Sequence, residues 1–343
     1  MTFFCIAYFL RITSNTFKEL QIAARMASSA DFVDVQDGRA RFRFSSNASW
    51  ILRWVGMKRS ERVVASIVHW ALAASPAGPR PLMLDIGANA GYYGLLAISL
   101  GARAIFFEPQ PVCCDWIEQS LGANAWGQDR GAVIRSAIAA SESPRSFRVG
   151  HDCNGGFSLL SRHQLSRSQG TAAGYVFPRS LASLQLPEFV ADAPVGSIAL
   201  VKVDVEHFEI PLLRFNLVPL LRRRLIRHLV VEITPFLWHK AARKPQAAAF
   251  ADGLSMVSDV ASFGYTVYSP RWRGALPLAE RSFNLSHHIG SIPRNVKWNG
   301  QEDLHFALED GAPEAQAVAE ARKMTHCCTH LDCACSISQT VSK

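Results

Sequence analysis

The stretch from Leu82 to Gln110 constrains the fold most, because a strand, a glycine-rich turn, a helix and a second strand follow one another within it. The apolar run LMLDI predicts a buried strand, GYYGLLAISLG predicts a helix that ends at Gly101, and ARAIFFE predicts the second strand. Strands that alternate with helices pair in parallel and form an open sheet with helices on both faces. We therefore expect an α/β chain with a Rossmann-like, doubly wound, mostly parallel sheet.

The rest of the chain divides around this unit. The run SPAGPRP, residues 75–81, breaks the preceding helical pattern, so we place the main domain at residues 81–295. Segment 31–80 is predicted to form a hairpin and an amphipathic helix that packs on the core. Residues 1–30 are expected to be an N-terminal extension, and residues 296–343 a polar tail containing Cys and His.

Charge, hydropathy and cysteine content narrow the function classes. The net charge of +8 is spread along the chain, and the densest basic run, RRRLIRH, fits a solvated helix end. No pattern typical of a flipped-base enzyme is present, so a nucleic-acid partner is not expected. The apolar run Phe3 to Leu10 is far shorter than the about 20 residues that span a bilayer, so no membrane span is expected. The 8 cysteines lack the spacing of a disulfide scaffold, which favours a reduced, cytoplasmic protein.

The loop after the first strand carries the strongest ligand signal: Asp85, Gly87, Asn89 and Gly91. A nicotinamide site uses Gly-x-Gly-x-x-Gly so that a pyrophosphate can approach the backbone, and here the second glycine is Asn89. The carboxylate of Asp85 would repel a pyrophosphate at this place. It suits a ligand with a cationic ammonium or sulfonium group and no phosphate, such as S-adenosylmethionine.

A second carboxylate, Glu108, ends the next strand 21 residues after Gly87. At that position a carboxylate accepts hydrogen bonds from ribose hydroxyls, a device shared by dinucleotide and S-adenosylmethionine sites. Glu108 therefore predicts an adenosine ligand without choosing between these two.

Four motifs together resemble the FkbM-type S-adenosylmethionine-dependent methyltransferase family. They are DIGANAGYYG, FFEPQP, LVKVDVEHFE and VVEI, in matching order across about Leu82 to Ser269. The resemblance implies the S-adenosylmethionine-dependent methyltransferase fold, with Asp85, Gly87, Asn89 and Gly91 along the methionine part of the cofactor and Glu108 at its ribose. It also implies that later-strand residues gather near the methyl group and the acceptor: Lys202, Asp204, Glu206, Glu209 and Glu232.

Alternation along VKVDVE places Lys202, Asp204 and Glu206 on one side of a strand. Two interpretations of these residues stay open. They are groups that take part in the reaction, or Lys202 forms an ion pair with Asp204 or Glu206 that stabilises the end of the strand. They are compatible with one another.

Two residues depart from the family pattern. His207 stands where the family block has glycine, and it is either a base for an acceptor hydroxyl or a residue that caps a helix or faces solvent. Ala182 stands where the family tends to have an acidic residue after leucine. We include His207 among the candidate catalytic residues, with Lys202, Asp204, Glu206 and Glu232.

Two other segments invite a ligand hypothesis. The run from Asn154 to Ser158 resembles a Gly-x-Ser segment of the family's middle loop. The tail HCCTHLDCACS holds zinc-competent residues, but their spacing differs from that of common zinc sites, and no metal is expected.

The sequence thus predicts a methyltransferase that uses S-adenosylmethionine, with a small-molecule or glycan hydroxyl as the acceptor. Two alternatives remain: a nicotinamide or nucleotide-sugar enzyme on a similar fold, and a non-catalytic binding protein on a methyltransferase scaffold.

Overall fold

The computed structural model describes residues 25–26, 32–48, 51–52, 55, 59–73, 80–138, 145–148, 153, 173–176, 179–184, 186, 193–242, 244–269, 274–276, 278, 285–290 and 302–308. All of these residues belong to one unit, Ile22–Leu308.

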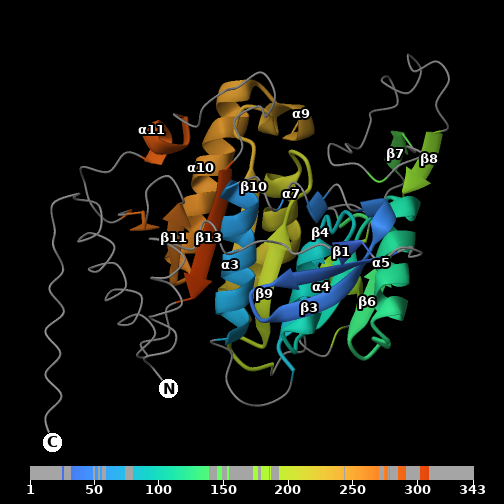
Figure 1. The fold of residues 1–343 in the computed structure, drawn as a ribbon. Coiled ribbons are helices and arrows are strands. Elements are labelled where there is room, and N and C mark those ends of the chain that lie inside the picture. Colours follow the sequence, from blue (N-terminus) through green and yellow to red (C-terminus); the bar gives the residue numbers. More distant parts are fainter. Residues whose placement is uncertain are drawn as a thin grey trace, which may run out of the picture. The chain divides into compact units, whose positions relative to one another are not determined.

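An eight-stranded sheet runs through this unit in the order β12-β11-β13-β10-β9-β4-β5-β6 (Figure 1). Five neighbouring strands, from β10 to β6, pair in parallel, whereas β13 runs antiparallel between β10 and β11. The expected Rossmann-like, mostly parallel sheet is thus confirmed. Its strands are β4 (Leu82–Ile86), β5 (Arg103–Phe107), β6 (Gly131–Ile134), β9 (Ile198–Val203), β10 (Ile226–Ile233), β11 (Tyr265–Ser269), β12 (Gly274–Ala275) and β13 (Glu302–Leu308).

The central strands form because their sequences suit burial on both faces. Every residue of β4 and β9 is buried, as the near-continuous apolar runs LMLDI and IALVKV require. The helices that follow β4 and β5 are α4 (Tyr92–Ser99) and α5 (Pro111–Ala123), and a proline opens α5 where no backbone donor is needed.

Helices cover both faces of the sheet. On one face the apolar strand residues, such as Met83 and Leu200, pack with α4, α5 and α3 (Arg59–Ala73). On the other face, residues such as Leu84 and Val201 pack with α7 (Glu209–Leu212), the π-helical turn η5 (Leu213–Leu217), α8 (Val218–Arg222), α9 (Trp238–Ala242) and α10 (Gln246–Ser262). The face on which a strand side chain lies therefore decides which helices it meets.

The segment before β4 adds a layer on the α3 side. The strands β2 (Phe32–Asp37) and β3 (Ala40–Ser45) form the predicted hairpin, with β1 (Arg25–Met26) beside β2 and the short helix η2 (Ser46–Ala48) after β3. Phe42 and Phe44 of β3 are buried and pack edge to face on Tyr92 of α4. The hairpin therefore contacts the helix that follows the glycine-rich loop.

Strand β13 corrects the expected end of the main domain at residue 295. It lies in the segment assigned to a polar tail, yet it pairs with β10 from His228↔Ala307 to Ile233↔Glu302. It also pairs with β11 on its other side. The sheet therefore needs residues up to Leu308.

A disulfide joins Cys113 of α5 to Cys153, whose Cα atoms lie 4.9 Å apart. The expectation of reduced cysteines is wrong for this pair. The two residues are 40 positions apart, so their proximity is a product of the fold that cysteine spacing does not reveal. Cys114 is a buried free thiol.

The remaining described elements are β7 (Arg145–Arg148) paired with β8 (Ala173–Val176), η3 (Leu181–Leu184) and α11 (Leu285–Gly290), and Leu181 and Ile289 are buried in the core on the α7 side. Within the described part of the chain, no helix combines the length and the apolar character needed to cross a membrane.

Candidate active site

The glycine-rich loop between β4 and α4 is built on alternating left-handed residues. Gly87, Asn89 and Gly91 have φ values of 77°, 52° and 84°. A Cβ on Gly87 would lie 1.8 Å from the carbonyl oxygen of Asp204, so only glycine permits the loop to meet the end of β9. Asparagine tolerates the left-handed region better than most residues. Asn89 therefore takes the backbone conformation that a glycine would take, and its presence alone does not exclude a dinucleotide.

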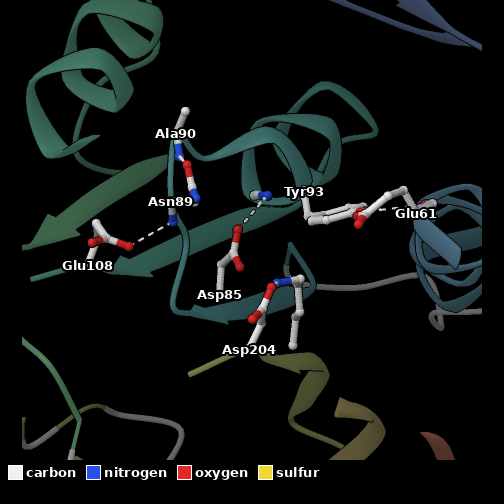
Figure 2. Close-up of polar contacts among 9 residues, drawn as sticks. Glu61, Asp85, Asn89, Ala90, Tyr93, Glu108 and Asp204 are labelled. Carbon is white, nitrogen blue, oxygen red and sulfur yellow. Dashed lines mark hydrogen bonds and ion pairs between the residues drawn. The ribbon is translucent and has the colours of Figure 1, made fainter. Parts of the chain in front are cut away.

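Asp85 differs from the expectation that its carboxylate stands at an open mouth. It is fully buried and its Oδ2 accepts a hydrogen bond from the Gly94 backbone N–H at 3.0 Å (Figure 2). Burial raises the pKa of Asp85, and the ammonium of Lys202 opposes that rise. In this structure Asp85 holds the first turn of α4 in place through its hydrogen bond with the Gly94 N–H.

Glu108 connects the end of β5 to the loop, as Figure 2 shows. Its Oε2 accepts a hydrogen bond from the Asn89 N–H at 2.8 Å, and its Oε1 accepts one from the Gln110 N–H at 2.8 Å. The side chain is buried, which raises the pKa of Glu108 to about 7, although these backbone donors favour the ionised form. Oε1 also accepts a hydrogen bond from the Gln110 side-chain amide at 3.2 Å, so Oε2 is the oxygen that retains acceptor capacity, because a carboxylate oxygen has two lone pairs.

A row of ionisable side chains crosses the sheet on the face toward α3. Register places Asp85 of β4 beside Lys202 of β9, and Glu232 of β10 beside Asp303 of β13. These residues alternate with apolar ones that face the α7 side, such as Val201 and Val231. Strand pairing therefore gathers charged groups that are far apart in the sequence.

Lys202 forms the ion pair that the sequence left open. Its Nζ lies 3.1 Å from Asp204 Oδ2, and its side chain is only 7% exposed. Burial would lower the pKa of Lys202, but the carboxylates of Asp204 and Asp85 outweigh burial and raise it above its ordinary value. Lys202 is therefore held as a cation beside the loop.

Glu232 lies half-buried among other carboxylates. Its pKa is raised well above the ordinary value, first by burial and then by the negative charges of Asp204 and Asp303. Asp303 is directly opposite on the antiparallel strand, where like charges destabilise one another. A raised proton affinity is what a carboxylate needs to accept a proton near neutral pH.

His207 lies in a second group of polar contacts at the end of β9. Its φ of 81° is left-handed, its backbone N–H donates to Glu209 Oε1 at 2.7 Å, and its Nδ1 lies 3.0 Å from Thr234 Oγ1. Trp238 Nε1 donates to Glu209 Oε2 at 3.1 Å. Glu209 is fully buried, and this burial raises its pKa to about 8. The neighbouring Glu206 is also left-handed, with φ 49°.

Several residues of the site were not among the sequence candidates. Glu61 comes from α3, Tyr93 from α4, Asp303 from β13, and Thr234 directly follows β10. Thr234, two residues after Glu232, and Tyr93, inside the motif DIGANAGYYG, carry a local signal, whereas Glu61 and Asp303 depend on packing and register. Ala182 is exposed in η3. The segment from Asn154 to Ser158 and the Cys/His tail lie outside the described residues.

Residues 85–265 match the model of the methyltransferase FkbM domain. This match covers more than half of the 343 residues. The chain belongs to the FkbM methyltransferase family. Membership decides for a methyltransferase over a nicotinamide or nucleotide-sugar enzyme.

The chain is distantly similar to several solved methyltransferase structures. No curated protein sequence matches this chain. Among solved structures, precorrin-6y C5,15-methyltransferase from Geobacter metallireducens is similar at 12% identity, over 74% of this chain and 91% of that one, with a TM-score of 0.34. A METTL16 methyltransferase domain has 11% identity, 73% and 83% coverage and a TM-score of 0.36. TYW2 from P. horikoshii in complex with MeSAdo has 11% identity, 82% and 74% coverage and a TM-score of 0.32.

Proposed function

We propose that this FkbM-family chain transfers a methyl group from S-adenosylmethionine to a hydroxyl of a small molecule or a carbohydrate. The observation that carries the proposal is the placement of Glu232, a half-buried carboxylate of raised pKa, in the same row as the Lys202–Asp204 ion pair, whose Asp204 lies against Gly87 of the glycine-rich loop. A hydroxyl acceptor must lose its proton during methyl transfer, and a carboxylate of raised proton affinity suits that task.

The cofactor pocket is proposed on the loop and Glu108. The left-handed residues Gly87, Asn89 and Gly91 keep the backbone close to the edge of the sheet, and Oε2 of Glu108 keeps acceptor capacity for a ribose hydroxyl. Asp85 is proposed to act indirectly, because its buried carboxylate holds the turn in which α4 begins. When bound, the cofactor would supply the methyl group on its sulfonium.

The protein side of the reaction is alignment and proton transfer. Correct alignment of acceptor and methyl group supplies much of the rate enhancement in a displacement of this kind. Glu232 would accept the hydroxyl proton, and Lys202, paired with Asp204, would fix the charge distribution around it. We propose that Glu206 and His207 shape the acceptor side through their left-handed backbone.

Calorimetric titration of S-adenosylhomocysteine tests the cofactor site. Micromolar binding is expected for the wild type, and Glu108→Ala should abolish it. Glu118→Ala is the matched control, because Glu118 is an exposed carboxylate on α5 that pairs with Arg135 at 2.7 Å. A well-folded wild type that does not bind would overturn the proposed function.

Methyl transfer from labelled S-adenosylmethionine to a panel of sugar and polyketide-like hydroxyl compounds tests the chemistry. Glu232→Gln should lower kcat by about 100-fold, in the range of general-base contributions, and leave S-adenosylhomocysteine binding unchanged. Transfer to amines alone would contradict hydroxyl acceptance.

The cytoplasmic location stays a prediction from the sequence. The Cys113–Cys153 disulfide argues against it, because such bonds persist mainly in oxidising compartments.

A further inference from the structure

Helix α3 lies outside the segment that matches the family, yet it contributes to the candidate active site. The match covers residues 85–265, whereas α3 spans Arg59–Ala73. Glu61, in the first turn of α3, is one of the carboxylates whose charge raises the pKa of Lys202. The site is therefore built partly by a helix that the family model does not include.

Two consecutive tyrosines connect this N-terminal layer to α4. The Tyr92 hydroxyl donates a hydrogen bond to Asp37 Oδ2 at 2.6 Å, and the Tyr93 hydroxyl donates one to Glu61 Oε2 at 2.5 Å. The Tyr93 hydroxyl also lies 3.2 Å from the Glu61 carbonyl oxygen. Both tyrosines are buried. Each contact joins a phenol of α4 to a carboxylate of the preceding layer, so the two pairs are chemically alike.

Only the second pair reaches the charged row of the sheet. The Lys202 Nζ lies 5.2 Å from the centroid of the Tyr93 ring, within the range of a cation–π contact. Figure 2 shows Tyr93 between Glu61 on one side and the region of Asp85 on the other. Tyr92 instead packs against Phe42 and Phe44 of the hairpin.

We propose that Glu61 is a positioning residue for Lys202, and that it acts by fixing the Tyr93 ring against which the Lys202 ammonium lies. The proposal rests on the proposed function, in which Lys202 and Asp204 organise the reacting groups. Glu61 orients the hydroxyl, the hydroxyl orients the ring, and the ring face confines the ammonium toward Asp204.

Two groups, Asp204 and the Tyr93 ring, restrict the position of the Lys202 ammonium. Lys202 has four rotatable side-chain bonds, and a lysine ammonium without confinement samples many rotamers. Asp204 holds it from one direction at 3.1 Å, and the Tyr93 ring lies in another. If the Tyr93 tether is lost, one of these two constraints weakens while the carboxylate partner stays.

Acylation of lysine amines, followed by mass spectrometry of the peptides, measures the exposure of Lys202 in the full chain. A small amine-acylating reagent reacts only with a deprotonated, accessible amine. Lys244 provides an internal reference, because it is half-exposed and its ion pair with Asp252 is on the surface. The ratio of Lys202 to Lys244 labelling rates is the readout.

Four variants distinguish a specific effect on the position of Lys202 from a general loosening of helix α4. Glu61→Ala and Tyr93→Phe should each raise the relative labelling rate of Lys202 about tenfold, as expected for the loss of one hydrogen bond to a charged acceptor. Glu61→Gln removes the charge that raises the pKa of Lys202 but keeps an acceptor oxygen for the Tyr93 hydroxyl, so its labelling rate should rise less than that of Glu61→Ala. Tyr92→Phe removes a matched phenol–carboxylate bond away from Lys202 and should leave the rate unchanged.

Equal increases in Tyr92→Phe and Tyr93→Phe would overturn the proposal, because they would report a loosened helix. So would unchanged labelling in folded Glu61→Ala, or an increase in Glu61→Gln as large as that in Glu61→Ala. Thermal unfolding establishes that each variant is folded. Calorimetry with S-adenosylhomocysteine on the wild type tests the cofactor site separately, so failure of the proposed function and failure of the Glu61 role give different results.

Discussion

His207 occupies a position where the family block has glycine, and the backbone explains why glycine suits it. With φ at 81°, this residue is in the left-handed region that L side chains rarely adopt. The contacts of its N–H with Glu209 and of its ring with Thr234 hold it there. Strain of this kind is common at functional sites, where the surrounding structure maintains it.

Substitutions at His207 should reveal both the strain and the contacts. His207→Ala keeps the strain and loses the ring contact, whereas His207→Gly loses both. We therefore expect His207→Gly to unfold with a free energy about 1 kcal/mol higher than His207→Ala, since an alanine at positive φ is penalised. Chemical denaturation measures the difference. A less stable glycine variant would contradict the left-handed conformation.

Glu108 predicts a pH dependence of cofactor binding. Its pKa, raised to about 7 by burial, means that it gains a proton as the pH falls through 7. The protonated form accepts hydrogen bonds less well, so the Kd for S-adenosylhomocysteine should rise by up to about tenfold for each pH unit below 7. Calorimetry between pH 6 and 8 tests this.

Glu108→Gln is the control for that measurement. It removes the titrating group and keeps one acceptor oxygen, so its weaker binding should be independent of pH across the same range. The same pH dependence in Glu108→Gln would assign the titration to another residue.

For individual residues, the sequence predicts the position of those that belong to one strand and the loop after it. Gly87, Gly91 and Glu108 lie at the loop as expected, and Lys202 pairs with Asp204. For Asp85 the sequence supported two conflicting expectations, a buried strand over LMLDI and a carboxylate at an open mouth, and the Gly94 N–H of α4 covering its carboxylate decides for burial. Glu61 and Tyr93 meet only through packing of α3 on α4.

Among the elements, α3 covers the site at one end and a histidine pair at the other. His228 of β10 and His305 of β13 are both buried, with 3.4 Å between Nδ1 and Nε2. The Trp70 ring of α3 lies 4.6 Å from the His228 ring, measured between centroids. Burial lowers the pKa of His305 to about 3 and that of His228 well below its ordinary value.

This pair makes the packing of α3 on the sheet sensitive to acid. Between pH 6.5 and about 3, an unfolded chain binds a proton at His305 and the folded chain does not, so the unfolded state holds more protons. The free energy of unfolding should therefore fall as the pH drops through this range, and be unaffected by His305 above it. Urea titrations at several pH values measure the slope.

His305→Phe keeps an aromatic ring beside Trp70 and Tyr268 and removes the titration, so the acid-dependent slope should decrease. His287→Gln, on the exposed side of α11, should leave the slope unchanged. An unaltered slope in His305→Phe would show that other groups control acid unfolding.

Element prediction succeeded where the pattern is local and failed where pairing is distant. The strand–helix alternation from β4 to β6 follows directly from apolar runs and turn residues. Strand β13 has the sequence EDLHFAL, whose polar Asp303 and His305 alternate with apolar residues in a polar region of the chain. Its role becomes clear only when β10 and β11, far apart in sequence, accept it between them.

For the molecule as a whole, the Cys113–Cys153 disulfide is expected to be a major contribution to stability. It closes a segment of 40 residues, and a loop of that length is worth about 4 kcal/mol in the chain-entropy view. Reduction by a dithiol reagent, or Cys153→Ala, should lower the free energy of unfolding by this order. Denaturation with and without reductant measures it.

Cys114→Ala is the control, because Cys114 is a free buried thiol next to the disulfide. The stability of this variant should retain the full sensitivity to reductant. If the free energy of unfolding of the wild type is the same with and without reductant, the disulfide does not contribute to stability.

The sheet order also constrains synthesis. A ribosome releases β10 and β11 well before β13, which must enter between them. Until residue 308 emerges, β10 has an open edge of unpaired backbone groups, a surface prone to pairing with other chains. The nascent chain is therefore expected to complete this sheet only after β13 has been translated, and to depend most on chaperones just before then.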